Sequence, residues 1–346
     1  MCNLPFIRRE EVVEVRVPST DHTLVHDANG TTLMMQLIID AQKSDGSPAV
    51  HRLLFAVSLP PLGYTTVFVS RQTAPPSDSR MHSGSPGTQI KTPELEVSFS
   101  NTTGRMQSIT NRRAGHAAVA VDQQFLDYGS NKQCWMGPWA FTDTEDGPAT
   151  PIHPGKATVV TVASGPLLHE VQQTWGPGRQ YVEQTVRVYA TGSKRAVVET
   201  VVTVAQPVED AHSSVVRFDT GVNSVETVGD GPPEVVFFTD GNGMELRKRV
   251  VNKTSWGINN VTELVAGNYY PVTDTVRTTP CRVNVAKRTT GAFVTTQFAC
   301  CRQVLIRSAK EQFAVLTDRA HGATYAHQYT VVDCTEYFAE HKCRHS

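Results

Sequence analysis

The feature that most constrains the fold of this chain is a two-residue alternation of apolar and polar side chains. In the segment 94–100, Leu95, Val97 and Phe99 alternate with polar residues. Successive side chains of a β-strand point to opposite faces, so this spacing places the three apolar residues on one face. The segment is therefore predicted to be a strand with one buried face.

The residues that follow predict a hairpin. Residues 101–104 read Asn-Thr-Thr-Gly, a composition typical of turns. The segment 105–109 then has the pattern of a returning strand.

The same theme recurs along the chain. Runs rich in valine, threonine and aromatic residues suit a pleated, half-buried surface. They occupy 158–163, 167–175, 181–189, 196–204, 213–218 and 234–238, and most end at glycine or proline. No segment shows a sustained 3.6-residue period with helix caps, so an all-β protein built of sandwiches is predicted.

Composition suggests how the β structure is divided. The stretch 71–92 is polar and rich in proline, glycine and serine, which is typical of a linker. We therefore expect a small β-sandwich at 1–75, a linker or long loop at 76–92 and a larger β domain at 93–325. Residues 326–346 have no clear place in a sandwich, and we expect a divergent, disordered tail there.

Charge and hydropathy exclude several classes of function. The 346 residues include 32 basic and 33 acidic ones, a net charge of -1. This balanced charge does not favour binding to nucleic acid or to an anionic membrane. No apolar run is long enough to span a bilayer. The first residues do not resemble a signal peptide, so we expect any secretory signal to lie upstream of this chain.

The seven cysteines indicate neither a disulfide framework nor a zinc site. They stand at positions 2, 134, 281, 300, 301, 334 and 343, and no pair has the short spacing of a zinc ligand set. Four N-x-S/T sequons begin at Asn29, Asn101, Asn252 and Asn260. They favour exposed loops and a lumenal compartment.

Several polar groups could be considered for chemistry. His169 and Glu183 could form the acid/base pair of a sugar mutarotase, although paired polar groups on neighbouring strands are commoner. Asp240, Asn242 and Glu245 flank two glycines and are better explained by a turn than by a metal site. The tail holds histidines 327, 341 and 345 with Cys334 and Cys343, at spacings that fit no zinc signature.

A set of short segments, taken together and in order, resembles the C-terminal region of family 38 glycoside hydrolases, the α-mannosidases. The resemblance is carried by 3–10, 60–64, 165–171, 217–220, 237–245, 267–272 and 316–319, which read NLPFIRRE, PPLGY, GPLLHEV, RFDT, FFTDGNGME, GNYYPV and LTDR. Residues 278–310 intervene before the last segment, where the family is shorter. After Gly322 the sequence also departs from the family pattern.

The resemblance implies a fold and a reaction. The small sandwich would be followed by a large β-supersandwich of the galactose-mutarotase type. Family members hydrolyse terminal α-mannosides with retention, which needs two carboxyl groups about 5–5.5 Å apart, and they carry zinc on His and Asp ligands. In the family these groups lie in N-terminal catalytic and helical domains. We therefore expect no catalytic residue and no metal ligand in this chain.

The implied role is to wall the substrate cleft of an α-mannosidase of the lysosomal type and to brace its catalytic domain. Trp139 lies where the family has a sugar-contacting aromatic residue, so it is the candidate substrate-binding residue, although a core or loop role is commoner.

The implied partners are α-mannoside glycans and the N-terminal domains, in the lysosomal or secretory lumen. The chain alone is expected to be inactive and poorly soluble. The alternatives are a non-catalytic carbohydrate-binding β-sandwich, tested at Trp135 or Trp139, and a mutarotase-like sugar epimerase.

Overall fold

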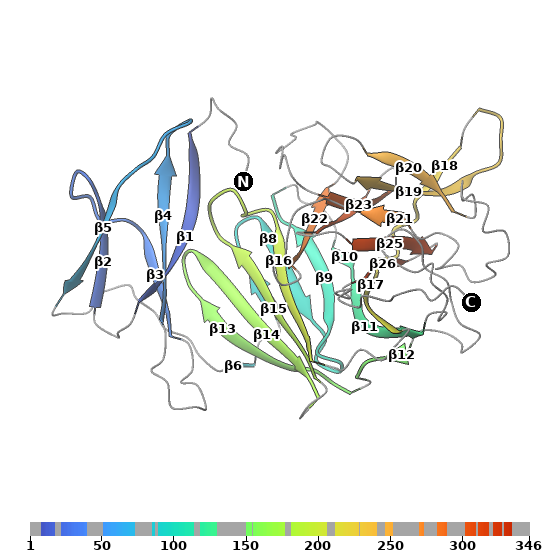
Figure 1. The fold of residues 1–346 in the computed structure, drawn as a ribbon, viewed down its shortest axis with the longest axis horizontal. Helices are drawn as coiled ribbons and strands as arrows, with labels where there is room; N and C mark the ends of the chain where they lie inside the picture. Colours follow the sequence, from blue (N-terminus) through green and yellow to red (C-terminus); the bar gives the residue numbers. More distant parts are fainter. Residues whose placement is uncertain are drawn as a thin grey trace, which may run out of the picture.

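A computed structural model describes most of the strand-forming part of the chain. It describes residues 8–17, 22–39, 51–72, 85–86, 89–113, 118–129, 150–153, 155–176, 181–205, 212–227, 229–240, 246–251, 270–272, 282–288, 302–308, 311–317, 321–326 and 329–333. Within these ranges the chain forms strands, turns and irregular segments without a helix (Figure 1). The predicted all-β class is confirmed. Over the same ranges, no helix is long and apolar enough to cross a membrane.

Two small sheets form the N-terminal part, which we call the N-terminal sheets. One has the order β1 (Arg9–Val17), β4 (His51–Leu59), β3 (Met35–Ile39), and the other pairs β2 (His22–Asp27) with β5 (Val67–Gln72). The central strand β4 is buried on both faces, which explains its nearly unbroken apolar run. Leu53 and Phe55 pack toward Val25 of β2. Leu54 points to the opposite face and packs against strands that follow the N-terminal sheets in the chain.

An antiparallel sheet of eleven strands, here the large sheet, runs through the middle of the molecule. Its strands in spatial order are β18 (Val225–Glu226), β19 (Glu234–Asp240), β23 (Arg302–Arg307), β24 (Gln312–Thr317), β22 (Arg282–Arg288), β16 (Val198–Ala205), β15 (Tyr181–Tyr189), β14 (Leu168–Trp175), β13 (Thr158–Ser164) and β6 (Ser85–Pro86), with β20 (Arg247–Val250) paired to β19. The intervening segment 278–310 thus supplies strands β22 and β23 to this sheet.

Two further sheets cover one face of the large sheet. The first has the order β10 (Val119–Ala120), β9 (Met106–Asn111), β8 (Leu95–Phe99), β7 (Gln89–Lys91). The second has the order β12 (Thr150–Pro151), β11 (Asp122–Gly129), β17 (His212–Asp219), β26 (Tyr329–Asp333), β25 (His321–Ala326), β21 (Tyr270–Val272).

The main hydrophobic core lies between the large sheet and these two sheets. The predicted alternation is confirmed, because Leu95, Val97 and Phe99 are all buried in it. Phe218 of β17 packs against Phe313 of β24 with ring centroids 5.7 Å apart. Interlocking aromatic and branched side chains of this kind fix the distance between sheets.

The predicted hairpin is also confirmed. Strands β8 and β9 pair antiparallel, and the backbone N–H of Gly104 donates to the carbonyl of Ser100 at 2.7 Å. Gly104 has a φ of +69°, and a Cβ there would lie 2.4 Å from the carbonyl oxygen of Ala157. Only glycine fits this position.

Two expected segment boundaries differ from the structure. Strands β6 and β7 lie within the segment 76–92 that was expected to be a linker, and Ile90 is buried because β7 pairs with β8. Strand β26 lies within the expected tail 326–346 and pairs with β17, so residues 329–333 belong to a sheet. Composition missed these three strands because each is short, and because the partners of β6 and β26, the strands β13 and β17, are distant in sequence.

Candidate functional site

The candidate substrate-binding residue Trp139 lies outside the described residues, as does Trp135. The same holds for Asn242, Glu245 and the cysteines, and for the histidines of the tail. Asp240 ends β19, where its backbone pairs opposite Gln303.

The structure does not bring His169 and Glu183 together. His169 of β14 lies opposite Val188 of β15, whereas Glu183 lies opposite Thr174. Opposed residues share a face and successive residues alternate, so the two side chains point to opposite faces of the large sheet. The hydroxyl of Ser164 lies 3.2 Å from Nδ1 of His169. Burial lowers the pKa of this histidine.

The strongest cluster of buried charges lies instead where the N-terminal sheets meet the large sheet. We call it the interface cluster; it consists of Arg52, Glu170 and Arg187. Nη1 and Nη2 of Arg52 on β4 donate to the two carboxylate oxygens of Glu170 on β14 at 2.9 and 2.8 Å. Nε of Arg187 on β15 donates to the same carboxylate at 2.6 Å. A bidentate pair strengthened by a second arginine is a strong and directional arrangement.

The electrostatics of this cluster keep the carboxylate ionised. Burial alone would raise the pKa of Glu170, but the hydrogen bond from Arg52 and the charges of Arg187 and Arg52 outweigh it, so the pKa lies below its ordinary value. Burial also works against the charge of Arg187, but Glu170 and then Glu14 raise its pKa. Glu170 therefore suits a structural ion pair rather than the donation of a proton.

An apolar cluster and the side-chain amide of Gln36 complete this interface. The buried apolar side chains are Ile38, Leu54, Ala163, Leu167, Leu168 and Tyr189. Oε1 of Gln36 accepts from the backbone N–H groups of Leu167 and Leu168 at 3.0 and 2.9 Å, and Nε2 donates to the carbonyl of Leu168 at 2.8 Å. Gly165 makes this approach possible, because a Cβ there would lie 2.4 Å from Cδ of Gln36.

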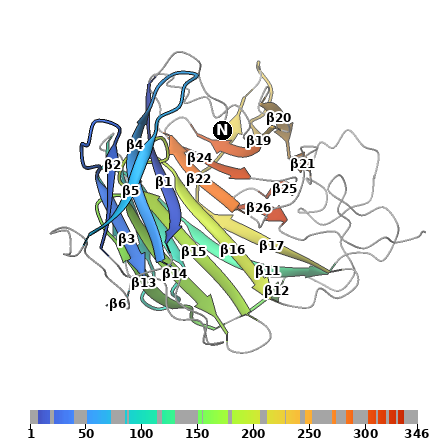
Figure 2. The same ribbon diagram turned by 60° about the vertical axis from the view of Figure 1, so that its left-hand side comes forward.

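Contacts at the edge extend the same interface. The hydroxyl of Thr191 donates to Glu10 at 2.8 Å, and the hydroxyl of Ser193 donates to Glu11 at 2.8 Å. Gly192 lies between them with a φ of +81° and passes close to the backbone of Val12. Buried charges, apolar packing and edge hydrogen bonds thus join the N-terminal sheets to the large sheet as one body (Figure 2).

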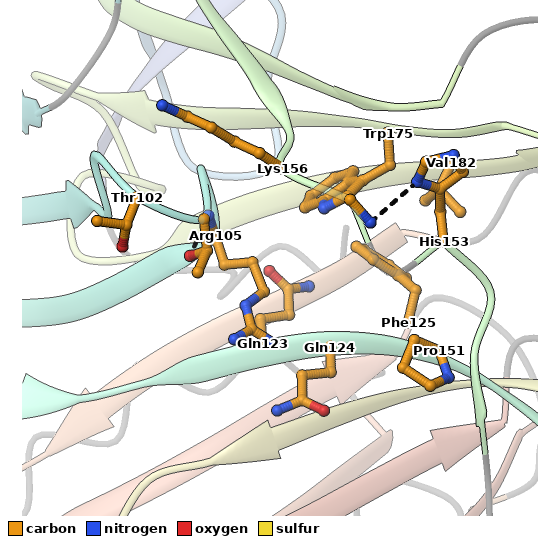
Figure 3. Close-up of a pocket in the computed structure, with 12 residues that line it drawn as sticks. Thr102, Arg105, Gln123, Gln124, Phe125, Pro151, His153, Lys156, Trp175 and Val182 are labelled. Atoms are coloured by element: carbon orange, nitrogen blue, oxygen red, sulfur yellow. Dashed lines mark hydrogen bonds between the residues drawn. The ribbon is translucent and has the colours of Figure 1, made fainter.

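A second feature is a hollow of about 250 Å³ at the other end of β14 and β15 (Figure 3). Its wall comes from the turn before β9, the first half of β11, the segment 151–156 and the ends of β14 and β15. Phe125 and Trp175 meet there edge to face, with ring centroids 5.1 Å apart. No sequence pattern predicted this hollow, because the residues that line it come from segments up to 80 positions apart.

The zinc implied by the family resemblance needs a set of His, Cys, Asp or Glu ligands. Among the described residues, no group of three or more His, Cys, Asp or Glu side chains is placed to hold a metal ion. The described residues therefore do not fit a zinc site.

Comparison with known proteins gives a consistent result. The family described as glycosyl hydrolases family 38 C-terminal domain matches residues 90–333. A probable alpha-mannosidase of Arabidopsis thaliana is 30% identical over 301 residues, which cover 75% of this chain and 27% of that protein. The human lysosomal alpha-mannosidase is 31% identical over 273 residues, which cover 75% of this chain and 25% of that protein.

The solved structure of a glycosyl hydrolase family 38 protein from Enterococcus faecalis is similar over 95% of this chain and 42% of the Enterococcus chain. The sequence identity is 12% and the TM-score is 0.45. The chain spans about a quarter of the length of the curated relatives it matches. Because the family match covers more than half of the chain, the chain belongs to glycosyl hydrolase family 38, as a protein with the C-terminal domain of that family.

Proposed function

We propose that this chain serves as the C-terminal β region of a retaining α-mannosidase, where it walls the substrate cleft and braces the catalytic part. The observation that carries the proposal is the family match over residues 90–333, together with relatives that are alpha-mannosidases. In this proposal the carboxyl pair and the zinc ligands belong to the part of the relatives outside the matched region. A mutarotase-type supersandwich is the arrangement proposed for the large domain.

The interface cluster supports a bracing role. A brace must resist deformation, and Arg52 and Glu170 are held by paired, directional hydrogen bonds. Apolar packing around Leu54 adds to their effect. Such a body could present a fixed wall to a neighbouring domain.

Exposed apolar side chains support contact with another part of the enzyme. Among the described residues, Met34, Leu62, Tyr64, Phe68 and Val69 of the N-terminal region are 49–89% exposed, and only one other large apolar side chain is comparably exposed. Where exposed apolar side chains adjoin one another, they often mark a protein contact. We propose that this region packs against the catalytic part.

Activity measurement tests the proposal. The chain is assayed on a chromogenic α-mannoside with zinc, alone and mixed with the N-terminal part of an alpha-mannosidase relative. We expect no hydrolysis by the chain and hydrolysis by the mixture. Hydrolysis by the chain alone would overturn the proposal, as would an inert mixture in which the two parts demonstrably associate.

Variants sharpen this test. Tyr64→Ser and Phe68→Ser should weaken assembly of the mixture, whereas Leu246→Ser, which changes an exposed apolar residue elsewhere, should not. Trp139→Ala should raise KM in the assembled enzyme if this residue contacts the sugar, as proposed from its place in the family pattern. An unchanged KM would remove Trp139 from the proposed site.

A lysosomal or secretory lumen is the proposed location. Relatives include the human and cat lysosomal alpha-mannosidases. Two of the four sequon asparagines, Asn29 and Asn101, are exposed on turns where a glycan could be added. Glycosidase treatment of the protein from secretory cells should then reduce its apparent mass, and an unaltered mass would count against this location.

A further inference from the structure

The hollow beside Phe125 and Trp175 presents hydrogen-bond donors that have no partner among the described residues. Gln123 is 1% exposed, yet its amide lines the hollow. Its Nε2 donates to Oε1 of Gln184 at 2.7 Å, and its Oε1 accepts from Nε2 of Gln184 at 2.8 Å. An amide nitrogen carries two N–H bonds, so one N–H of Gln123 has no partner among the described residues.

The glutamines beneath it leave little freedom to rearrange. Nε2 of Gln184 also donates to Oε1 of Gln173 at 2.7 Å, and Nε2 of Gln173 donates to the carbonyl of Gly104 at 2.6 Å. This chain of amides fixes which way each oxygen and nitrogen points. The free N–H of Gln123 is therefore held in place, as a buried donor that costs free energy while it is unsatisfied.

Arg105 and Trp175 carry other donors near Gln123, and the side chain of Lys156 extends from the rim away from them (Figure 3). The indole N–H of Trp175 has no hydrogen-bond partner in the described part of the chain. Nε of Arg105 lies 3.1 Å from Oδ1 of Asp122 without hydrogen-bond alignment, and the rest of its guanidinium has no described partner. Lys156 is exposed at the rim and likewise pairs with no described residue.

The charge of the wall is one-sided. The residues that line the hollow are Thr102, Thr103, Arg105, Gln123, Gln124, Phe125, Pro151, His153, Gly155, Lys156, Trp175 and Val182. This set contains two cations and no carboxylate. Asp122 offsets part of the charge of Arg105 from outside the lining.

We propose that the hollow binds a monosaccharide-sized ligand that carries an anionic group, either a carboxylate or a phosphate. The anion would accept from Arg105, and the exposed side chain of Lys156 would turn from the rim toward it, because charge-assisted hydrogen bonds from these groups are the strongest ones offered. The ring oxygens and hydroxyls would accept from Gln123 and Trp175. Phe125 and Trp175 supply the apolar floor against which the C–H face of a sugar packs.

The volume agrees with a ligand of this size. Pockets for drug-sized ligands occupy roughly 300–1,000 Å³, and about 250 Å³ is slightly smaller. A single sugar residue is therefore the appropriate scale. This site is separate from the proposed contact with the catalytic part, so either proposal can fail without the other.

Tryptophan fluorescence of the full chain offers a direct titration, because Trp175 lies in the floor. Glucuronate and glucose 6-phosphate supply the two anionic groups, mannose is the neutral sugar, and inorganic phosphate is the anion without a sugar. We expect both anionic sugars to bind at least about tenfold more tightly than mannose or phosphate. Preference for only one of the two would identify the anionic group. Equal affinity for mannose, equal affinity for phosphate, or no binding at all would overturn the proposal.

Two variants test the assignment to residues. Arg105→Gln and Lys156→Gln should each weaken binding of the preferred anionic sugar about tenfold. Lys91→Gln is the matched control, because Lys91 is an exposed cation on β7 outside the lining of the hollow. Lys156 is exposed and makes no described contact, so its variant keeps the test valid even where Arg105→Gln alters folding. Undiminished affinity in both variants would contradict the site.

Discussion

The interface cluster and the hollow both contain arginines, but these arginines differ in how deeply they are buried and how they are paired. Arg52 and Arg187 share one buried carboxylate, and the side chain of Arg52 is only 9% exposed. Among the described residues Arg105 pairs with Asp122 alone, and both of these side chains are more than 30% exposed. A buried charge that is paired with a carboxylate holds a structure together, whereas a more exposed charge with few partners can still bind a ligand.

The largest expected effect follows from breaking the interface cluster. Glu170→Gln would leave Arg52 and Arg187 facing an amide in a buried site, which should lower the free energy of unfolding by about 3–5 kcal/mol. Urea unfolding measures this loss.

Glu226→Gln serves as its control. Glu226 also accepts from two cations, Arg307 and Lys248, but its side chain is 30% exposed. Its loss should cost about 1 kcal/mol or less, because solvent screens such pairs. Equal losses for the two variants would mean that burial does not distinguish the two ion-pair clusters.

Substitutions of two glycines, Gly104 and Gly221, test how tightly the turn beside the hollow is packed. Gly104→Ala must adopt a positive φ and also place a methyl group against Ala157. We expect a loss of about 3 kcal/mol, from backbone strain of about 1 kcal/mol plus overpacking.

Gly221→Ala has the same strain, with a φ of +63°, but nothing lies within 4 Å of the added group. Its cost should be about 1 kcal/mol. Thermal unfolding of both variants gives the difference, and similar midpoints would show that the turn relaxes away from Ala157.

Arg105→Gln should have a much smaller effect on stability. It removes one partly exposed ion pair with Asp122, so the free energy of unfolding should fall by about 1 kcal/mol or less. A loss as large as that of Glu170→Gln would place Arg105 among the structural charges and would weaken the case for a ligand site. The same urea titration provides the value.

The smallest effect concerns pH. His169 has a pKa below its ordinary value of 6.5 in the folded chain, so the unfolded chain binds a proton more readily. Stability should therefore fall as pH falls from 6.5 toward the lowered pKa. His169→Gln should remove this slope in unfolding free energy between neutral and mildly acidic pH.

The interface cluster should not contribute to that slope. The pKa of Glu170 lies below its ordinary value of 4.5, so its contribution is present above 4.5 and is lost only as pH falls further. A steep loss of stability above pH 4.5 that Glu170→Gln abolishes would contradict the low pKa.

The sequence predicted the strands well where they alternate. Leu95, Val97 and Phe99 showed the buried face of β8, and the turn at 101–104 followed from local chemistry. Such features depend on neighbours in the chain, so one sequence is enough to find them.

Features that depend on strand register could not be predicted. His169 and Glu183 both have odd residue numbers. Only the observed pairing of Leu168 with Tyr189 shows that odd-numbered residues of β14 lie opposite even-numbered residues of β15. A shift of one residue would have put the two on the same face. The contacts of Arg52 with Glu170 and of Gln123 with Gln184 span 118 and 61 positions and depend on the same unknown.

Amide hydrogen exchange tests most directly whether the N-terminal sheets and the large sheet form the single braced body proposed here. In the unaltered chain, the amides of β1 and β4 should open with the same free energy as those of β14 and β15, because the interface cluster couples them. In Glu170→Gln, the amides of β1 and β4 should lose protection first. Fast exchange of β1 and β4 in the unaltered chain, with β14 and β15 still protected, would show two independent bodies and contradict the bracing role.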